Sequence, residues 1–383
     1  MSEQAAWRDG FSNIARFASL SRMKRTPDEM AENLAARRLL RFILQSAARE
    51  LLPKERVASC LRAVIPPHEK DWKPTDHKKT GVQVLYSAKW QRAFYGNLAQ
   101  CASIWVDPVC SSKITERRRV EMAGVLAGSK YYQLMATRTF QHSCEDRLTD
   151  LQLDFSEAKR RVKAGKGWAD IEKRFGVIGS ISGTEVTYSL KNGFHLHDHS
   201  DYLFKAEIGK DDFREVMLER YAAAMRDRGR YVSSLYGLDV RETNDAVTDY
   251  VSKWGVDFEL AKYPTKQARA GHYSAFQLLQ LYTEGVSWAG PVFREYAAAM
   301  KGKKQLVWSR GLRDILEAGR EVSDLELVEA AEEDAKTLAW LSLAQWKIIL
   351  RHEKRGELLE VASLGSYADL STYLRSFGIY LES

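Results

Sequence analysis

The chain has 383 residues, and 45% of them are hydrophobic. It is therefore long enough for two or three domains and apolar enough to bury a core, which excludes a disordered chain. The formal net charge of +7 mildly favours a polyanionic partner. No apolar run approaches the roughly 18 residues of a membrane span, and the N-terminus lacks the pattern of a signal peptide. We therefore expect a cytoplasmic protein without a membrane partner, whose four cysteines are thiols or metal ligands.

The N-terminal region, residues 1–81, is predicted to be helical. Residues 26–29 read Thr-Pro-Asp-Glu, which supplies an N-cap, a proline at the first helical position and a capping-box glutamate. They predict a helix that continues over residues 30–52, followed by a short helix from Pro53 to Arg62. Residues 63–81 contain several prolines and form a candidate linker.

The next region, residues 82–265, mixes strands with helices. Strand-like patterns lie at residues 82–86, 104–106 and 132–140, and helical patterns at residues 115–127 and 156–175. The clearest hairpin joins 183–190 to 194–204 through Lys-Asn-Gly, because Asn-Gly is a strong hairpin signal. A helix, a strand and another helix follow at residues 211–226, 231–240 and 243–254.

No regular alternation of strand and helix runs through this region, so we expect an α+β fold with an antiparallel sheet and flanking helices. Residues 261–274 form a second candidate linker. Beyond Phe276 the chain is predicted to be helical, with a capping box at residues 323–326, so residues 266–383 form a helical C-terminal region.

Three histidines lie at alternate positions of one predicted strand. Side chains two residues apart project from the same face, so His195, His197 and His199 line one face at a spacing of about 6.6–6.8 Å. Histidines together with a carboxylate suit a divalent metal with open coordination positions. Glu185 is the candidate carboxylate.

The register of the hairpin decides the role of Glu185. If residues 192–193 form a two-residue turn, Glu185 points away from the histidines. If the loop has three residues, Glu185 faces His199. The sequence leaves both registers open, because a shift of one residue moves every side chain to the other face.

A tyrosine and a lysine share one face of the predicted helix 243–254. Tyr250 and Lys253 are three residues apart. A nearby metal or ammonium group favours the phenolate and so activates a tyrosine as a nucleophile. The pair gains meaning only from its place after the histidine strand, because the chain has 17 tyrosines.

Two further groups of residues are candidates for binding. Cys101, Asp107 and Cys110 have the spacing of a zinc knuckle with an aspartate in one thiol position, although by themselves they are more typical of buried thiols. The basic cluster of Lys159, Arg160, Arg161 and Lys163 predicts either phosphate contacts or a solvated helix face.

Several stretches together resemble one known family. They are residues 134–142, which end in a histidine; residues 185–199, which contain the hairpin; residues 250–254, which read Tyr-Val-Ser-Lys-Trp; and the downstream residues 275–279 and 308–313. In order and spacing they resemble the motifs of the rolling-circle replication initiators of bacterial plasmids, in the histidine-hydrophobic-histidine (HUH) endonuclease superfamily. The resemblance covers residues from about 35 to about 320.

The resemblance implies an HUH nuclease fold in residues 82–265 and a metal-dependent cut in one strand of origin DNA. Tyr250 would form a 5′-phosphotyrosine link, and Lys253 would neutralise the phosphate or hold the tyrosine. The implied cofactor is Mg²⁺ or Mn²⁺. The implied partners are origin DNA, single-stranded, extruded as a hairpin or duplex, and host replication proteins.

The chain departs from the family pattern at three positions. Leu196 replaces a proline and Asp198 replaces a hydrophobic residue, so the ligand pair is His197 and His199 by register but His195 and His197 by the literal pattern. Asp107 stands where the family tends to have a cysteine, so a structural zinc site here would need an aspartate in place of one thiolate.

Two other functions compete with this interpretation. A degenerate initiator or repressor would bind a DNA sequence without cutting it, and Leu196 and Asp198 would then reflect lost metal binding. A metalloenzyme that acts on small molecules is disfavoured by the basic charge and by the lack of a cofactor fingerprint. A metal-dependent nicking assay separates the first alternative from the initiator.

Overall fold

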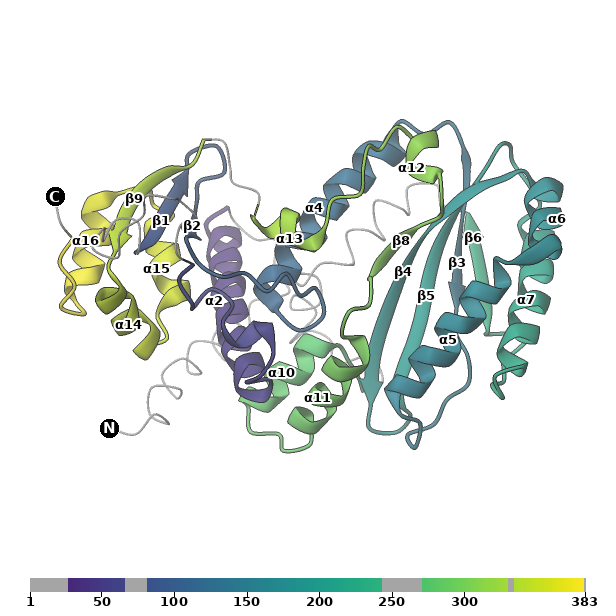
Figure 1. Ribbon diagram of the computed structural model, residues 1–383, viewed down its shortest axis with the longest axis horizontal. Helices are drawn as coiled ribbons and strands as arrows, with labels where there is room; N and C mark the ends of the chain where they lie inside the picture. The colour runs from purple at the N-terminus through teal and green to yellow at the C-terminus, as the bar shows by residue number, and fades with distance from the viewer. Residues whose placement is uncertain (1–26, 66–80, 243–270, 330–333, 382–383) are drawn as a thin grey trace. The chain divides into compact units, whose positions relative to one another are not determined.

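The structure is a computed structural model that describes residues 27–65, 81–242, 271–329 and 334–381. The chain divides into two compact units. Unit 1 contains the residues up to 103, residues 107–113 and the residues from 323 onward, and unit 2 contains residues 104–106 and 114–322. Each unit combines an antiparallel sheet with helices (Figure 1), which confirms the predicted α+β class.

Unit 2 is built on an antiparallel sheet in the order β6-β3-β5-β4-β7, with β8 paired to the first half of β4. The long β4–β5 hairpin, which the sequence predicted, lies at its centre. The strands are β3 (Tyr132–Arg138), β4 (Val177–Ser189), β5 (Gly193–Phe204), β6 (Leu238–Glu242), β7 (His272–Tyr273) and β8 (Leu306–Trp308).

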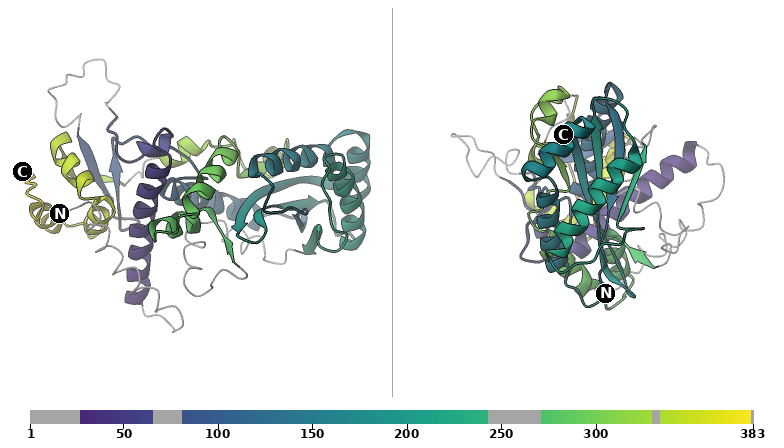
Figure 2. Two further views of the ribbon diagram at one scale, coloured as in Figure 1. Left: turned by 90° about the horizontal axis from the view of Figure 1, so that it is seen from below. Right: turned by 90° about the vertical axis from the view of Figure 1, so that its right-hand side faces the viewer.

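Helices cover the sheet of unit 2 on both faces. Helices α5 and α7 pack against each other on one face (Figures 1 and 2), where Phe213 of α7 makes edge-to-face contacts with Tyr202 and Phe204 of β5. On the other face, Met122 of α4 packs in a buried cluster with Leu203 of β5. The helices are α4 (Pro108–Ala127), α5 (Leu148–Val162), α6 (Gly165–Phe175), α7 (Lys210–Arg226), α10 (Ala275–Thr283), α11 (Ala289–Met300) and α12 (Leu312–Ile315).

Alternation along β5 places different chemistry on its two faces. The even-numbered residues face α5 and α7, and the odd-numbered residues, which include the three histidines and Leu203, face the side of α4. This alternation follows from the two-residue period of a strand.

Unit 1 contains a small antiparallel sheet in the order β2-β1-β9. Helix α15 packs on β2 and on α2, and the Arg38 side chain of α2 forms an ion pair with Glu360 of α15. The elements are α2 (Pro27–Leu51), η1 (Arg56–Ala58), β1 (Val82–Ser87), β2 (Arg92–Gly96), α13 (Asp324–Glu329), β9 (Lys336–Leu341), α14 (Leu343–Arg351), α15 (Arg355–Ala362) and α16 (Tyr367–Arg375), and the start of α4.

Four local predictions were wrong. Residues 104–106 form a turn before α4 instead of a strand, and the predicted helix 156–175 is two helices separated at residues 163–164, just before Gly165, whose φ of +72° is left-handed. Of the predicted strand 231–240, only residues 238–240 are in a strand, β6, which continues to Glu242. The predicted helix from Pro53 to Arg62 is limited to the single turn η1.

The C-terminal region is not purely helical, because it contains β7, β8 and β9. Pairing over long sequence distances explains this difference, since β8 joins β4 and β9 joins β1. The compact units therefore divide the chain differently from the predicted regions 1–81, 82–265 and 266–383: β1 and β2 belong with β9, and residues 271–322 belong with the central sheet.

Among the described residues, no helix combines the length and apolar character that a membrane crossing requires.

Candidate metal centre

The β4–β5 register places Glu185 on the same face as the histidines. Ser189 pairs with Gly193, so the loop has three residues, 190–192, and Gly193 adopts a left-handed φ of +72° as the chain turns. Glu185 lies directly opposite His197, and Gly183 lies opposite His199. Of the two registers that the sequence left open, the three-residue loop places Glu185 on the correct face. Its predicted partner was His199, however, and its observed partner is His197, two residues earlier.

One carboxylate oxygen meets two imidazoles. Glu185 Oε2 lies 2.9 Å from His197 Nε2 and 3.4 Å from His199 Nε2. Two ligand atoms that each lie about 2.0–2.2 Å from one metal ion are separated by about 2.8–3.6 Å at tetrahedral or octahedral angles. The two distances from Glu185 to the imidazoles therefore fit a single small divalent cation, and all three ligand atoms lie within 4.8 Å of one another.

Neighbouring strands hold this group of ligands. Thr137 of β3 pairs with His199, and its Oγ1 lies 3.0 Å from His199 Nδ1. This contact orients the ring so that Nε2 is directed toward Glu185. On His197, the buried Nδ1 has no hydrogen-bond partner among the described residues.

The charge of Glu185 is favoured by its neighbours. Partial burial acts against ionisation, but the hydrogen bonds and charges of His197 and His199 hold the pKa of Glu185 below its ordinary value. The carboxylate is thus ionised at neutral pH and can accept a cation.

The third histidine of the strand has a different partner. His195 Nδ1 lies 2.8 Å from His142 Nε2, and His142 Nδ1 lies 3.0 Å from the carbonyl oxygen of Asn192. Burial and the adjacent imidazoles lower the pKa of His195 to about 3, so this ring is neutral at physiological pH. The ring of His272 on β7 lies 6.2 Å from that of His195. The three rings form a second group of imidazoles beside the first.

The opposite face of β5 carries a buried ion-pair network. Asp198 is fully buried and accepts hydrogen bonds from Arg138 at 3.0 Å and from Lys159 at 2.7 Å. Arg138 Nη2 also donates to Ser200 at 3.0 Å. Because Asp198 faces away from the histidines, it fixes β3, β5 and α5 to one another and does not reach the metal ligands.

The basic cluster of α5 is divided between two environments. Lys159 and Lys163 turn toward the sheet, where Lys163 Nζ donates to Ser180 Oγ at 2.6 Å. Arg160 and Arg161 are exposed and pair with Glu157 and Asp227. Contacts of this segment with DNA remain a prediction, which now depends mainly on the two arginines.

The predicted nucleophile Tyr250 and its neighbour Lys253 lie outside the described residues.

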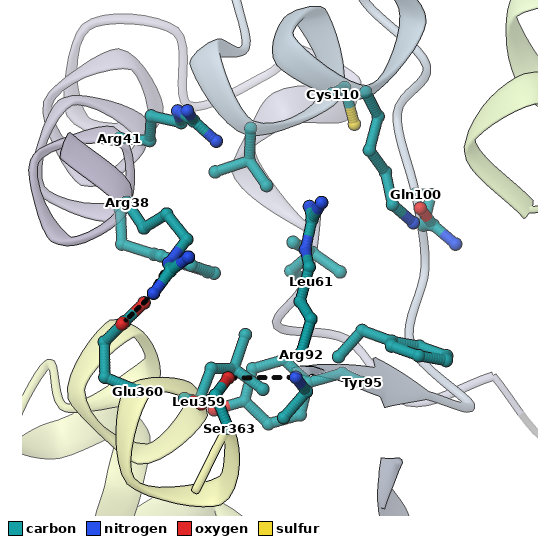
Figure 3. A pocket seen from close by; sticks show the side chains of 15 residues that line it. Arg38, Arg41, Leu61, Arg92, Tyr95, Gln100, Cys110, Leu359, Glu360 and Ser363 are labelled. Carbon is teal, nitrogen blue, oxygen red and sulfur yellow. Dashed lines mark hydrogen bonds and ion pairs between the residues drawn. The ribbon is translucent and has the colours of Figure 1, made fainter. Parts of the chain in front are cut away.

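In unit 1, the structure brings Cys101, Asp107 and Cys110 together and adds Cys60. Their candidate ligand atoms all lie within 4.8 Å of one another, and all four residues are buried. A pocket nearby is lined by Arg38, Arg41, Arg92 and other residues of α2, β2, α4 and α15 (Figure 3).

Sequence reasoning missed three contributors to these clusters. His142 ends the first stretch of the family resemblance, which was the available signal for it. Thr137 could be found only through the pairing of β3 with β5, and Cys60 only through the approach of its loop to Cys101.

The fold and the site define an α+β protein with a carboxylate–histidine centre on the middle strands of a sheet. The chain is 26% identical to "Protein rep" of Streptomyces lividans, over 68% of this chain and 73% of that protein. It is also 29% identical to the "Neomycin resistance protein" of Streptomyces cyanogenus, but over only 27% of this chain and 30% of that protein. No protein-family model and no solved structure matches the chain.

Proposed function

We propose that this chain is a plasmid replication protein that initiates rolling-circle replication by nicking one strand of origin DNA. The similarity to "Protein rep" supports the role in replication. The observation that carries the nicking activity is the convergence of Glu185, His197 and His199 on one point of the sheet. An HUH-type nuclease requires such a group of ligands on its central hairpin.

The donor set offers one carboxylate oxygen and two imidazole nitrogens, and it leaves open positions for a phosphate. Of Mn²⁺ and Mg²⁺ it favours Mn²⁺, because imidazole is a better ligand for a transition metal than for Mg²⁺. A bound divalent ion supplies charge that polarises the scissile phosphate. The protein orients its own ligands: Thr137 holds the His199 ring, and the pairing of β4 with β5 holds Glu185 opposite His197. Asp198 and Arg138 fix the strand from its other face.

The nucleophile in this proposal is Tyr250, whose phenolate oxygen attacks phosphorus. A 5′-phosphotyrosine bond forms, the bond between phosphorus and the 3′-oxygen breaks, and a proton transfers to that oxygen to leave a 3′-hydroxyl. Lys253, three residues later, neutralises the phosphate or the phenolate. Both assignments come from the sequence motif and its order after the histidine strand.

The deciding experiment incubates the full chain with supercoiled origin plasmid and Mn²⁺ or Mg²⁺. We expect a nicked circle with protein covalently attached, and no product when EDTA removes the metal. Tyr250→Phe should keep DNA binding but abolish both the nick and the adduct. The control is Tyr236→Phe, which changes an exposed tyrosine of unit 2 and should leave cleavage unaltered.

Two outcomes would contradict the proposal. A covalent adduct formed by Tyr250→Phe would show that another residue is the nucleophile. Specific DNA binding by the unaltered chain without any metal-dependent nick would favour the non-catalytic DNA-binding protein.

A further inference from the structure

Unit 1 contains a group of potential metal ligands that is separate from the histidine centre. Cys60 follows η1, Cys101 lies in the loop after β2, and Asp107 and Cys110 lie at the start of α4. The side chains of all four are buried, with exposed fractions of 0–5%. Three buried thiols and a buried carboxylate are the ligand types that zinc takes, and a cation lowers the cost of burying their charged forms.

The distances between the ligand atoms suit one zinc ion. Cys60 and Cys110 sulfurs are 3.5 Å apart, Cys101 and Cys110 sulfurs 3.8 Å apart, and Cys101 Sγ lies 3.1 Å from Asp107 Oδ2. Around a tetrahedral zinc with Zn–S of about 2.3 Å and Zn–O of about 2.0 Å, two sulfurs lie about 3.8 Å apart and a sulfur and an oxygen about 3.5 Å apart.

The backbone around two of the cysteines is shaped to support thiolates. The N–H of Cys101 is directed at Cys60 Sγ at 3.3 Å, and the N–H of Ser103 at Cys101 Sγ at 3.4 Å. The residues that follow these two cysteines, Leu61 and Ala102, have left-handed φ values of 50° and 52°. Such values are uncommon for residues with a side chain and persist only where the surroundings impose them.

A second set of contacts orients the carboxylate. Asp107 Oδ1 accepts hydrogen bonds from the backbone N–H groups of Val109 and Cys110, at 2.9 and 3.1 Å. Gln45 Nε2 donates to both carboxylate oxygens, and its own Oε1 accepts from the buried Arg355. This arrangement leaves Oδ2 directed toward the sulfurs, as outer hydrogen bonds do at metal sites.

We propose that Cys60, Cys101, Asp107 and Cys110 bind one structural zinc ion. Four protein ligands fill a tetrahedral shell and leave no open position for substrate, so the ion joins the loop of η1, the loop after β2 and the first turn of α4. Cys110 is at the wall of the pocket in Figure 3, which gives the ion an entry path. Cys101, Asp107 and Cys110 provide three ligands, and Cys60 provides the fourth.

The test measures zinc in the purified full chain by mass spectrometry, in a His197→Ala background that removes binding at the histidine centre. We expect one zinc ion per chain, nearly none after Cys60→Ser, and no change after Cys144→Ser, which alters the exposed cysteine. Because the zinc content is measured without any cleavage assay, the result is independent of the proposed function.

A second measurement covers the case in which Cys60→Ser does not fold. Co²⁺ exchanged into the His197→Ala chain should show thiolate-to-cobalt charge transfer and tetrahedral visible bands. Asp107→Cys should still bind one zinc and release it to a chelator more slowly, because thiolate is a softer ligand. Full zinc retention by Cys60→Ser, or a metal-free chain with all its thiols reactive and no cobalt spectrum, would overturn the proposal.

Discussion

His197 and His199 differ from His195 in what their rings contact. Both lie within 3.4 Å of Glu185, whereas His195 is paired with His142. Replacing His197 or His199 removes a ligand and one of the two imidazole contacts of Glu185. Replacing His195 breaks one contact between neutral rings.

We therefore expect His197→Ala and His199→Ala each to weaken Mn²⁺ binding by at least about tenfold, the lower end of what even outer contacts contribute at metal sites. His195→Ala should weaken it less. Calorimetric titration of the full chain with Mn²⁺ measures all three variants. Equal losses from His195→Ala and His197→Ala, with His199→Ala unaffected, would assign the site to the other histidine pair.

Asp198→Ala is the matched control, because it changes the same strand on its opposite face. It leaves Arg138 buried without its carboxylate, so the free energy of unfolding should fall by about 3–5 kcal/mol. Mn²⁺ affinity of the folded protein should change little. Urea unfolding and the same titration separate the two effects.

At the scale of elements, the β4–β5 hairpin determines the site and α5 supports it. A three-residue loop sets the register that brings Glu185 to the histidine face. Helix α5 supports the other face through Lys159 and Lys163, whose ammonium groups lie 5.1 Å from the ring centres of Phe155 and Tyr202, respectively.

Lys163 gives the packing of α5 a pH dependence. Burial, and then the charge of Arg138, lower the pKa of Lys163 to about 7. The unfolded chain has a lysine pKa of about 10.4, so between pH 7 and pH 10.4 the unfolded state binds more protons and the stability rises with pH. Below pH 7 the cost of charging Lys163 is fully present.

Lys163→Met removes that cost. We expect the variant to be more stable than the unaltered protein by about 1–3 kcal/mol at pH 6, since the side chain is half-buried, and the gain to disappear toward pH 10. Urea unfolding at pH 6, 8 and 10 measures it. Lys166→Met, at an exposed position of α6, should show no such trend, and a gain that is constant with pH would contradict the assignment.

At the scale of the whole molecule, the net charge of +7 favours association with a nucleic acid. Arginine and lysine side chains that neutralise phosphates release counterions, which makes the affinity depend on salt. Arg160 and Arg161 are exposed on α5 and have only surface partners to exchange.

The affinity for origin DNA should therefore fall steeply between about 50 and 200 mM salt, by on the order of 10³-fold if about six phosphates are contacted. Replacing both Arg160 and Arg161 with alanine should reduce the slope of log affinity against log salt by up to about 2. Filter binding or fluorescence anisotropy measures both. A flat dependence on salt would exclude a broad phosphate interface.

Some features were determined by the sequence alone because they depend on local rules. The period of two along β5 places His195, His197 and His199 on one face and Asp198 on the other, and the Thr-Pro-Asp-Glu start predicts α2. The α+β class follows from the mixture of patterns. The nucleophile Tyr250 remains a prediction of the motif.

Tertiary structure decided what depends on partners distant in the sequence. The exact register of the hairpin made Glu185 a neighbour of both His197 and His199, and the pairing of β3 brought Thr137 to the site. Strand β9 lies in a segment that was predicted to be helical. Its pairing partner is β1, about 250 residues earlier, and a local sequence pattern does not show such a distant partner. Cys60 and Cys101 meet for the same reason: a loop has no periodicity that announces which other loop it will contact.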